Sequence, residues 1–322
     1  MTGHRCEGTE SREFPGPFVR VRGRVTREGV VTWSPGLRTE RGSAEPGKPV
    51  GGGVQEPGAR RVAAAAVITP ETFRVDFLDY RRQPVVSGPV AIEFRSRDAA
   101  VASFITRLPY HPETQFVQLA RGRQLLGAMQ VPTDRPFFTL LRPGPDDFVD
   151  GCGVLHIEWR GHDCQHPMTF FVRYAHDGLD WVRPGVNLKG SDYYLDLREM
   201  PGGERCVVQV LATNGYRTSY VETRRFEVPT KPPEILLGEN GGPVLFAQGF
   251  SREHGPIVAD GIVWLADQRE VGRGGTFDAR VLASGRHVIS IAVTSKEGKQ
   301  RKETVGTYDG ATGLRLGLNP GL

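Results

Sequence analysis

The alternation of apolar and polar residues constrains this chain more than any other feature. Short alternating runs bounded by Gly, Pro, Asn or Asp recur about every ten residues, whereas few windows keep the i, i+3, i+4 apolar spacing of a helix. Leu155, Ile157 and Trp159, for example, fall on one face of an extended segment. His156 and Glu158 fall on the other face. The pattern predicts an all-β protein made of tandem β-sandwich domains.

Turn residues place several hairpins between these runs. Asn214-Gly215 is the strongest short-range hairpin signal, and Glu28-Gly29, Gly122 and Asp177-Gly178 are further candidates. Each of these turns joins two runs that each have an apolar face, so we expect each to link neighbouring strands of one sheet.

Length and Pro-Gly content predict several domains. A chain of 322 residues is too long for one typical sandwich. Pro-rich stretches at 140–148 and 228–236 read as hinges, and the Gly- and Pro-rich stretch 46–61 reads as a flexible loop. We expect a disordered segment at 1–16, a β domain at 17–143 with a disordered insert at about 40–61, sandwiches at 144–229 and 230–309, and a flexible tail at 310–322.

Charge and hydropathy argue against two classes of partner. The net charge is only +4, and the densest basic stretch, 18–29, alternates Val with Arg as a strand with one solvated face does. We therefore expect no nucleic-acid partner. No apolar run approaches the roughly 18 residues of a membrane helix, so no membrane span is predicted. Residues 1–18 lack the apolar core of a secretory signal, so the protein either stays inside the cell or continues a longer chain.

Two stretches carry a resemblance to known modules. The strings "IEW", "FVRYAHDGLDW" and "CVVQVLATNGYRTSYVETRRFEV" make 144–229 resemble the fibronectin type III-like modules of bacterial secreted proteins. The string "VGRGGTFDARVLASGRHVISIAVTSKEG" makes 230–309 similar to bacterial Ig-like or PKD-like repeats. The resemblance implies that this chain is the carboxyl-terminal part of a secreted protein, with modules of the kind sometimes attached to peptidases. It implies an extracellular or cell-surface location.

The expected cores of these sandwiches hold the large inward-facing side chains. They are Trp159, Tyr174, Trp181, Val210 and Trp264. Trp33 stands outside the pattern at the end of a hairpin, and its role stays open.

One segment of the middle sandwich contains potential metal ligands. Related modules often carry several carboxylates after the tryptophan of the second strand, but Asp163 is the only one here, which argues against calcium. His162, Cys164 and His166 alternate and could present three zinc ligands on one side. Because no fourth ligand lies at a suitable spacing, the sequence favours a polar loop over a zinc site, and no cofactor is expected.

The four cysteines are too few for a disulfide framework. Cys152 and Cys206 fall at similar depth on facing strands of the expected sandwich, so a disulfide between them is one possibility. Alternation argues partly against it, since Cys206 shares the inward parity of Val208 whereas Cys152 has the parity of His156.

Familiar catalytic motifs are absent from the sequence. It contains no G-x-S-x-G, H-E-x-x-H, P-loop or C-x-x-C motif. Glu253-His254 lacks a second histidine, and the pair Asp146-Asp147 falls in a hinge. The favoured hypothesis is a non-catalytic structural or binding module with a protein or polysaccharide partner at the cell surface. An ancillary fragment of a secreted hydrolase and a carbohydrate-binding protein are the alternatives.

Overall fold

A computed structural model describes residues 9–39, 73–94, 96, 99–162, 167–239 and 242–316 of the chain. These residues form antiparallel β-sheets, so the all-β prediction is confirmed. The described helical segments are two 3₁₀ turns of three residues each, η1 (Ala259–Gly261) and η2 (Ala279–Val281). Among the described residues, no helix has the length and apolar character needed to cross a membrane.

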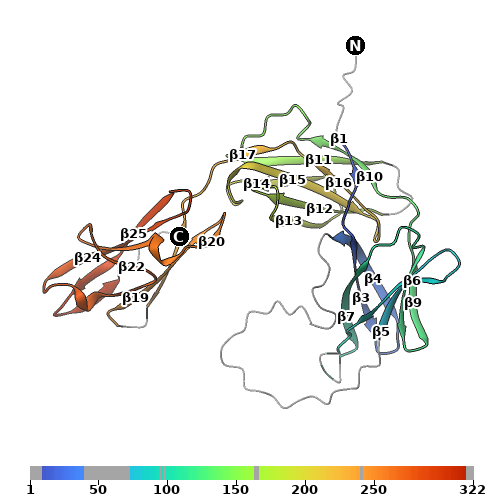
Figure 1. The fold of residues 1–322 in the computed structure, drawn as a ribbon, viewed down its shortest axis with the longest axis horizontal. Coiled ribbons are helices and arrows are strands. Elements are labelled where there is room, and N and C mark those ends of the chain that lie inside the picture. Colours follow the sequence, from blue (N-terminus) through green and yellow to red (C-terminus); the bar gives the residue numbers. More distant parts are fainter. Residues whose placement is uncertain are drawn as a thin grey trace, which may run out of the picture.

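The strands group into three units, each with two sheets around a hydrophobic core. We call them the first unit (18–39 and 73–131), the middle unit (9–14 and 137–228) and the third unit (234–316). The middle unit lies between the other two (Figure 1).

The first unit pairs a three-stranded sheet, in the order β4-β3-β7, with a four-stranded sheet, in the order β6-β5-β8-β9. Its strands are β3 (Phe18–Thr26), β4 (Val31–Thr39), β5 (Phe73–Leu78), β6 (Pro84–Val90), β7 (Val101–Pro109), β8 (Phe116–Arg121) and β9 (Gln124–Gln130). In β3 the valines Val19, Val21 and Val25 point into the core, as the alternation predicted. Gly29, at φ +90°, closes the predicted β3–β4 hairpin in a conformation that other residues rarely adopt.

The middle unit has sheets in the orders β1-β10-β11-β14 and β13-β12-β15-β16-β2, with β17 also paired to β15. Its strands are β1 (Thr9–Glu10), β2 (Arg12–Glu13), β10 (Phe137–Arg142), β11 (Val154–His162), β12 (Thr169–Ala175), β13 (Trp181–Leu188), β14 (Asp192–Asp196), β15 (Gly203–Thr213), β16 (Thr218–Glu222) and β17 (Phe226–Val228). The predicted turns at Asp177-Gly178 and Asn214-Gly215 join β12 to β13 and β15 to β16.

Both faces of β12, an inner strand of the second sheet of the middle unit, are covered. Every residue of β12 is buried, although alternation predicted one solvated face. Phe171 and Leu211, on the outer face, pack with Phe14 of the amino-terminal segment and Leu37 of β4. The amino-terminal segment and the first unit therefore dock on a surface that would be solvated in an isolated sandwich.

The third unit has sheets in the orders β18-β19-β20, with β23 also paired to β19, and β22-β21-β24-β25-β26. Its strands are β18 (Glu234–Glu239), β19 (Val244–Ser251), β20 (Gly255–Pro256), β21 (Ile262–Ala266), β22 (Arg269–Arg273), β23 (Thr276–Asp278), β24 (Arg286–Thr294), β25 (Gln300–Asp309) and β26 (Gly313–Leu316). Trp264 lies at the centre of its core and donates its indole N–H to the carbonyl of Gly274, 2.8 Å away.

Three expected boundaries are wrong. The segment 9–14, expected to be disordered, adds β1 and β2 to opposite sheets of the middle unit. Strand β10, assigned to the first domain from sequence, pairs with β11, so the middle unit begins before the hinge at 140–148. Residues 313–316, expected in the flexible tail, pair with β25 as β26. In each case pairing with another strand fixes a segment whose own sequence pattern is weak.

The three units share one strand arrangement. Numbered by chain order within the unit, and leaving out the short additions β1, β2, β17, β20 and β26, the middle and third units have sheets 1-2-5 and 4-3-6-7. The first unit has sheets 2-1-5 and 4-3-6-7, so only its first two strands are exchanged. This two-sheet arrangement is a fibronectin type III- or immunoglobulin-like β-sandwich.

Candidate functional site: an arginine-lined groove

The hairpin between β15 and β16 inserts a tyrosine of the middle unit into the core of the first unit. Tyr216 is fully buried there. Its ring packs edge-to-face on Phe77, with centroids 5.2 Å apart, and lies 5.5 Å from the ring of Tyr110. Its hydroxyl lies 2.8 Å from Thr114 Oγ1 and accepts a 3.2 Å hydrogen bond from the backbone N–H of His111. The two units therefore share one core.

Backbone contacts close the same junction. Gly36 of β4 donates its N–H to the carbonyl of Gly215, 3.0 Å away, and its carbonyl accepts a 2.9 Å hydrogen bond from the hydroxyl of Thr213. A Cβ atom on Gly36 would lie 2.2 Å from that carbonyl oxygen of Gly215. Glycine is required at position 36 because the two backbones approach closely.

A buried carboxylate joins the middle and third units. Glu253, in the turn between β19 and β20, is only 8% exposed. It accepts hydrogen bonds from the backbone N–H groups of Gly202 (3.0 Å) and Lys231 (3.2 Å) and from the hydroxyl of Ser251 (2.8 Å). Burial alone would raise the pKa of Glu253, but these donors outweigh it and lower the pKa below its ordinary value.

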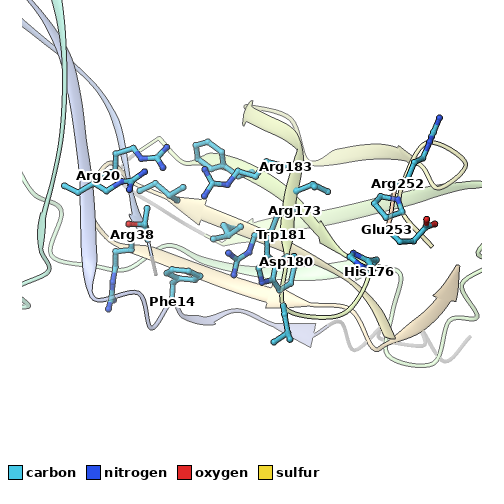
Figure 2. Close-up of a pocket in the computed structure, with 18 residues that line it drawn as sticks. Phe14, Arg20, Arg38, Arg173, His176, Asp180, Trp181, Arg183, Arg252 and Glu253 are labelled. Carbon is cyan, nitrogen blue, oxygen red and sulfur yellow. The ribbon is translucent and has the colours of Figure 1, made fainter. Parts of the chain in front are cut away.

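Between the two junctions, a groove of about 560 Å³ crosses the outer face of the second sheet of the middle unit. Residues of all three units line it (Figure 2). Arg20 lies at the end formed with the first unit, and Arg252 and Glu253 lie at the end formed with the third unit. The groove is strongly basic: its arginines are Arg20, Arg38, Arg107, Arg173, Arg183 and Arg252, and its acidic residues are Asp180 and Glu253.

Two of these arginines are held by carboxylates. Arg38 forms a 2.5 Å ion pair with Glu13 and is itself buried. Arg252 forms ion pairs with Glu234 (2.8 Å) and, across the junction of the middle and third units, with Glu199 (3.2 Å). These two charges are compensated, and they serve to connect segments of the fold.

Arg173 lies in the floor of the groove between aromatic rings. Its guanidinium lies 4.1 Å from the ring centroid of Trp181 and 5.2 Å from that of Phe14. Its Nε donates a 2.5 Å hydrogen bond to the side-chain oxygen of Gln209. Ring faces attract cations, so this buried guanidinium is stabilised in place and also fixes the ring of Trp181 in the groove.

Arg20 and Arg183 differ from these arginines. Neither has an ion-pair partner among the described residues, and the Nε of Arg20 is buried without a hydrogen-bond partner there. The pKa of Arg20 is lowered to about 10, first by burial and then by the positive charges of Arg107, Arg183 and Arg22. Positive charge is therefore concentrated at this end of the groove, and the Arg20 guanidinium there is incompletely hydrogen-bonded.

The predicted metal ligands are only partly described. His162 ends β11, where its Nε2 lies 2.6 Å from Thr139 Oγ1 and its ring lies against Phe137. Cys164 and His166 lie outside the described residues, so the zinc alternative stays a prediction. Within the described ranges, no three His, Cys, Asp or Glu side chains gather as a metal site would require.

The disulfide considered from sequence is not formed, because Cys152 and Cys206 are both free thiols. Cys152 is exposed in the turn before β11, whereas Cys206 is buried in the core of the middle unit. The hydroxyl of Tyr174 lies 3.0 Å from the sulfur of Cys206. Burial raises the pKa of the Cys206 thiol, which keeps it protonated and unreactive at neutral pH.

The expected core residues divide into two groups. Trp159, Tyr174, Val210 and Trp264 are at most 1% exposed. The prediction for Trp181 is wrong: this residue begins β13, is half-buried, and lines the groove. Trp181 pairs with Ala175, which shares the outer face of the sheet with Arg173. Its side chain therefore points away from the core that Tyr174 faces.

Other residues noted in the sequence have structural roles in the fold. Trp33, left open, is half-buried and packs edge-to-face on Phe104 of the first core. Asp147 accepts a 2.7 Å hydrogen bond from the N–H of Gly144 and so closes a turn. Glu253, considered only as part of an incomplete zinc-protease motif, holds the second junction. Sequence reasoning missed the groove because Arg20 sits in a run that reads as a solvated strand face.

Comparisons with known proteins found similar chains among solved structures. Neither a scan against protein-family models nor a search of curated proteins found a match. Among solved structures, the fibronectin(III)-like modules of Clostridium thermocellum CbhA are 13% identical over 52% of this chain and 90% of theirs, with a TM-score of 0.20. The chicken CNTN1 FN1-FN3 domains are 13% identical over 92% and 97%, with a TM-score of 0.20. Bacteroides uniformis beta-glucuronidase 3 is 13% identical over 54% and 25%, with a TM-score of 0.18.

Proposed function

We propose that this chain is a non-catalytic structural module whose three sandwiches act as one rigid body that spaces or presents a neighbouring domain. The insertion of Tyr216 into the core of the first unit carries the proposal. Tandem domains joined only by linkers move relative to one another by default, because their interfaces are small and polar. A side chain that completes the neighbouring core opposes such motion.

The second junction supports the same role. The buried carboxylate of Glu253 binds backbone N–H groups of the linker and of the middle unit, and Lys231 of the linker donates from its Nζ to the carbonyl of Leu197, 3.1 Å away. Removing one partner from buried bonds of this kind costs about 1–3 kcal/mol. Both ends of the middle unit are thus fixed. In this role the module works outside the cell or at its surface, with a protein domain or a surface polysaccharide as partner.

Small-angle X-ray scattering of the full chain tests the rigid arrangement. We expect one maximum dimension and a distance distribution that a single arrangement of the three units reproduces. A profile that only a broad ensemble of interdomain orientations could fit would overturn the proposal. Protease treatment of intact cells that produce the protein tests the location: a surface module is degraded while a cytosolic marker is spared, and protection together with that marker would contradict it.

A further inference from the structure

We propose that the groove binds a small organic oxyanion, with its carboxylate, phosphate or sulfate group held by Arg20 and Arg183 and its organic body packed against Trp181. This site is independent of the mechanical role proposed above. It uses residues that hold neither of the two junctions.

The hydrogen-bonding state of Arg20 points to a ligand. A buried N–H without a partner costs about 1–3 kcal/mol, and most buried polar groups in folded proteins avoid this cost. The Nε of Arg20 is such a group, in a wall of the groove. An oxyanion is the natural complement, since a guanidinium donates two parallel hydrogen bonds to a carboxylate or a phosphate group.

The surrounding charges point to the same chemistry. Arg107 and Arg183 lie close enough to Arg20 to disfavour its charged form, which costs energy unless an anion is present. Arg183 is exposed on the edge strand β13 and lines the groove, so its guanidinium is accessible to a ligand. Figure 2 shows Arg183 on the side of the groove next to Arg20, whereas Glu253 lies at the far end.

Size and the apolar surface argue for an organic anion instead of a bare ion. The volume of about 560 Å³ falls within the range of small-molecule sites and far exceeds the space that one phosphate ion needs. Trp181 and Val182 add apolar surface to the same stretch, and a half-buried indole ring can pack against a sugar ring or a carbon chain.

Isothermal titration calorimetry of the full chain at about 0.15 M salt tests the site, because long-range surface attraction is largely screened there. Citrate, pyrophosphate and digalacturonate serve as probes for a carboxylate, a phosphate and an acidic sugar, and digalactose is the neutral counterpart of the last. We expect saturable one-to-one binding of at least one anion and none of digalactose. The probe that binds shows whether the ligand carries a carboxylate, a phosphate or an acidic sugar. Quenching of the Trp181 fluorescence, lost in Trp181→Phe, places the ligand in the groove.

Variants distinguish the groove from general surface charge. We expect Arg183→Met and Arg20→Met each to weaken binding about tenfold or more, since each removes a charge-assisted contact. Arg123→Met, in an exposed turn of the first unit, is the matched control and should leave the affinity unchanged. Because Arg183 is exposed, its variant reports on the site even if Arg20→Met fails to fold. No saturable binding of any probe, or an equal loss in Arg123→Met, would overturn the proposal.

Discussion

Replacement of Tyr216 measures how strongly the first and middle units depend on each other. Its ring is fully buried among first-unit residues, so Tyr216→Ala should destabilise the protein by about 3–5 kcal/mol, as loss of a buried aromatic ring usually does. Tyr216→Phe keeps the ring and removes only the hydroxyl, which contacts Thr114 and His111. It should cost about 1–3 kcal/mol, because those buried groups lose their partner.

Differential scanning calorimetry of the full chain resolves where this destabilisation falls. In Tyr216→Ala the transitions of the first and middle units should move to lower temperature and separate, whereas that of the third unit stays in place. The control is Tyr80→Ala, since Tyr80 belongs to the first unit but is 68% exposed. The reasoning is refuted if Tyr216→Ala changes the first-unit transition no more than Tyr80→Ala does.

Three further changes test other parts of the fold. Because the pKa of Glu253 is lowered, its carboxylate stabilises the folded protein at pH values above the ordinary carboxyl pKa of 4.5, and this stability is lost as the pH falls through the lowered pKa. Unfolding measured as a function of pH should show this loss of stability in the wild type and not in Glu253→Gln. Gly36→Ala should loosen the first junction and increase protease cleavage between the first and middle units, whereas Gly310→Ala, where an added Cβ meets no atom within 4 Å, should not. Trp264→Phe should lower the free energy of unfolding in urea by about 1–3 kcal/mol more than Trp159→Phe does. The reason is that Trp264 loses an indole hydrogen bond, whereas the indole N–H of Trp159 has no partner among the described residues. Equal losses in the two variants would contradict this.

The sequence was most informative where a local rule decides the structure. The period of two in 155–159 and the Asn214-Gly215 turn both depend on neighbouring residues alone, and the structure has strands and a hairpin there. The same hairpin shows where local rules end. By its own sequence, the tip of this hairpin could equally well be exposed to solvent. The side chain of Tyr216 is buried because the first unit provides the pocket for it.

The groove lay beyond prediction for a related reason. The sequence pattern indicates a solvated face for the arginines of β3, and the alternation itself is correct. Whether that face meets water or the middle unit depends on how whole domains pack, which the spacing of residues within one strand does not encode. The segment 9–14 posed a similar problem, because strands of two residues are too short to show a period.

The pairing of β1 and β2 with opposite sheets of the middle unit has a consequence for synthesis. These residues are synthesised before their partner strands β10 and β16, which follow more than a hundred residues later. Until then, β1 and β2 lack their partner strands, and unpaired strand edges invite association with other chains. Fusing a bulky partner directly ahead of Thr9 should therefore lower the yield of soluble protein more than fusing the same partner after the carboxyl end.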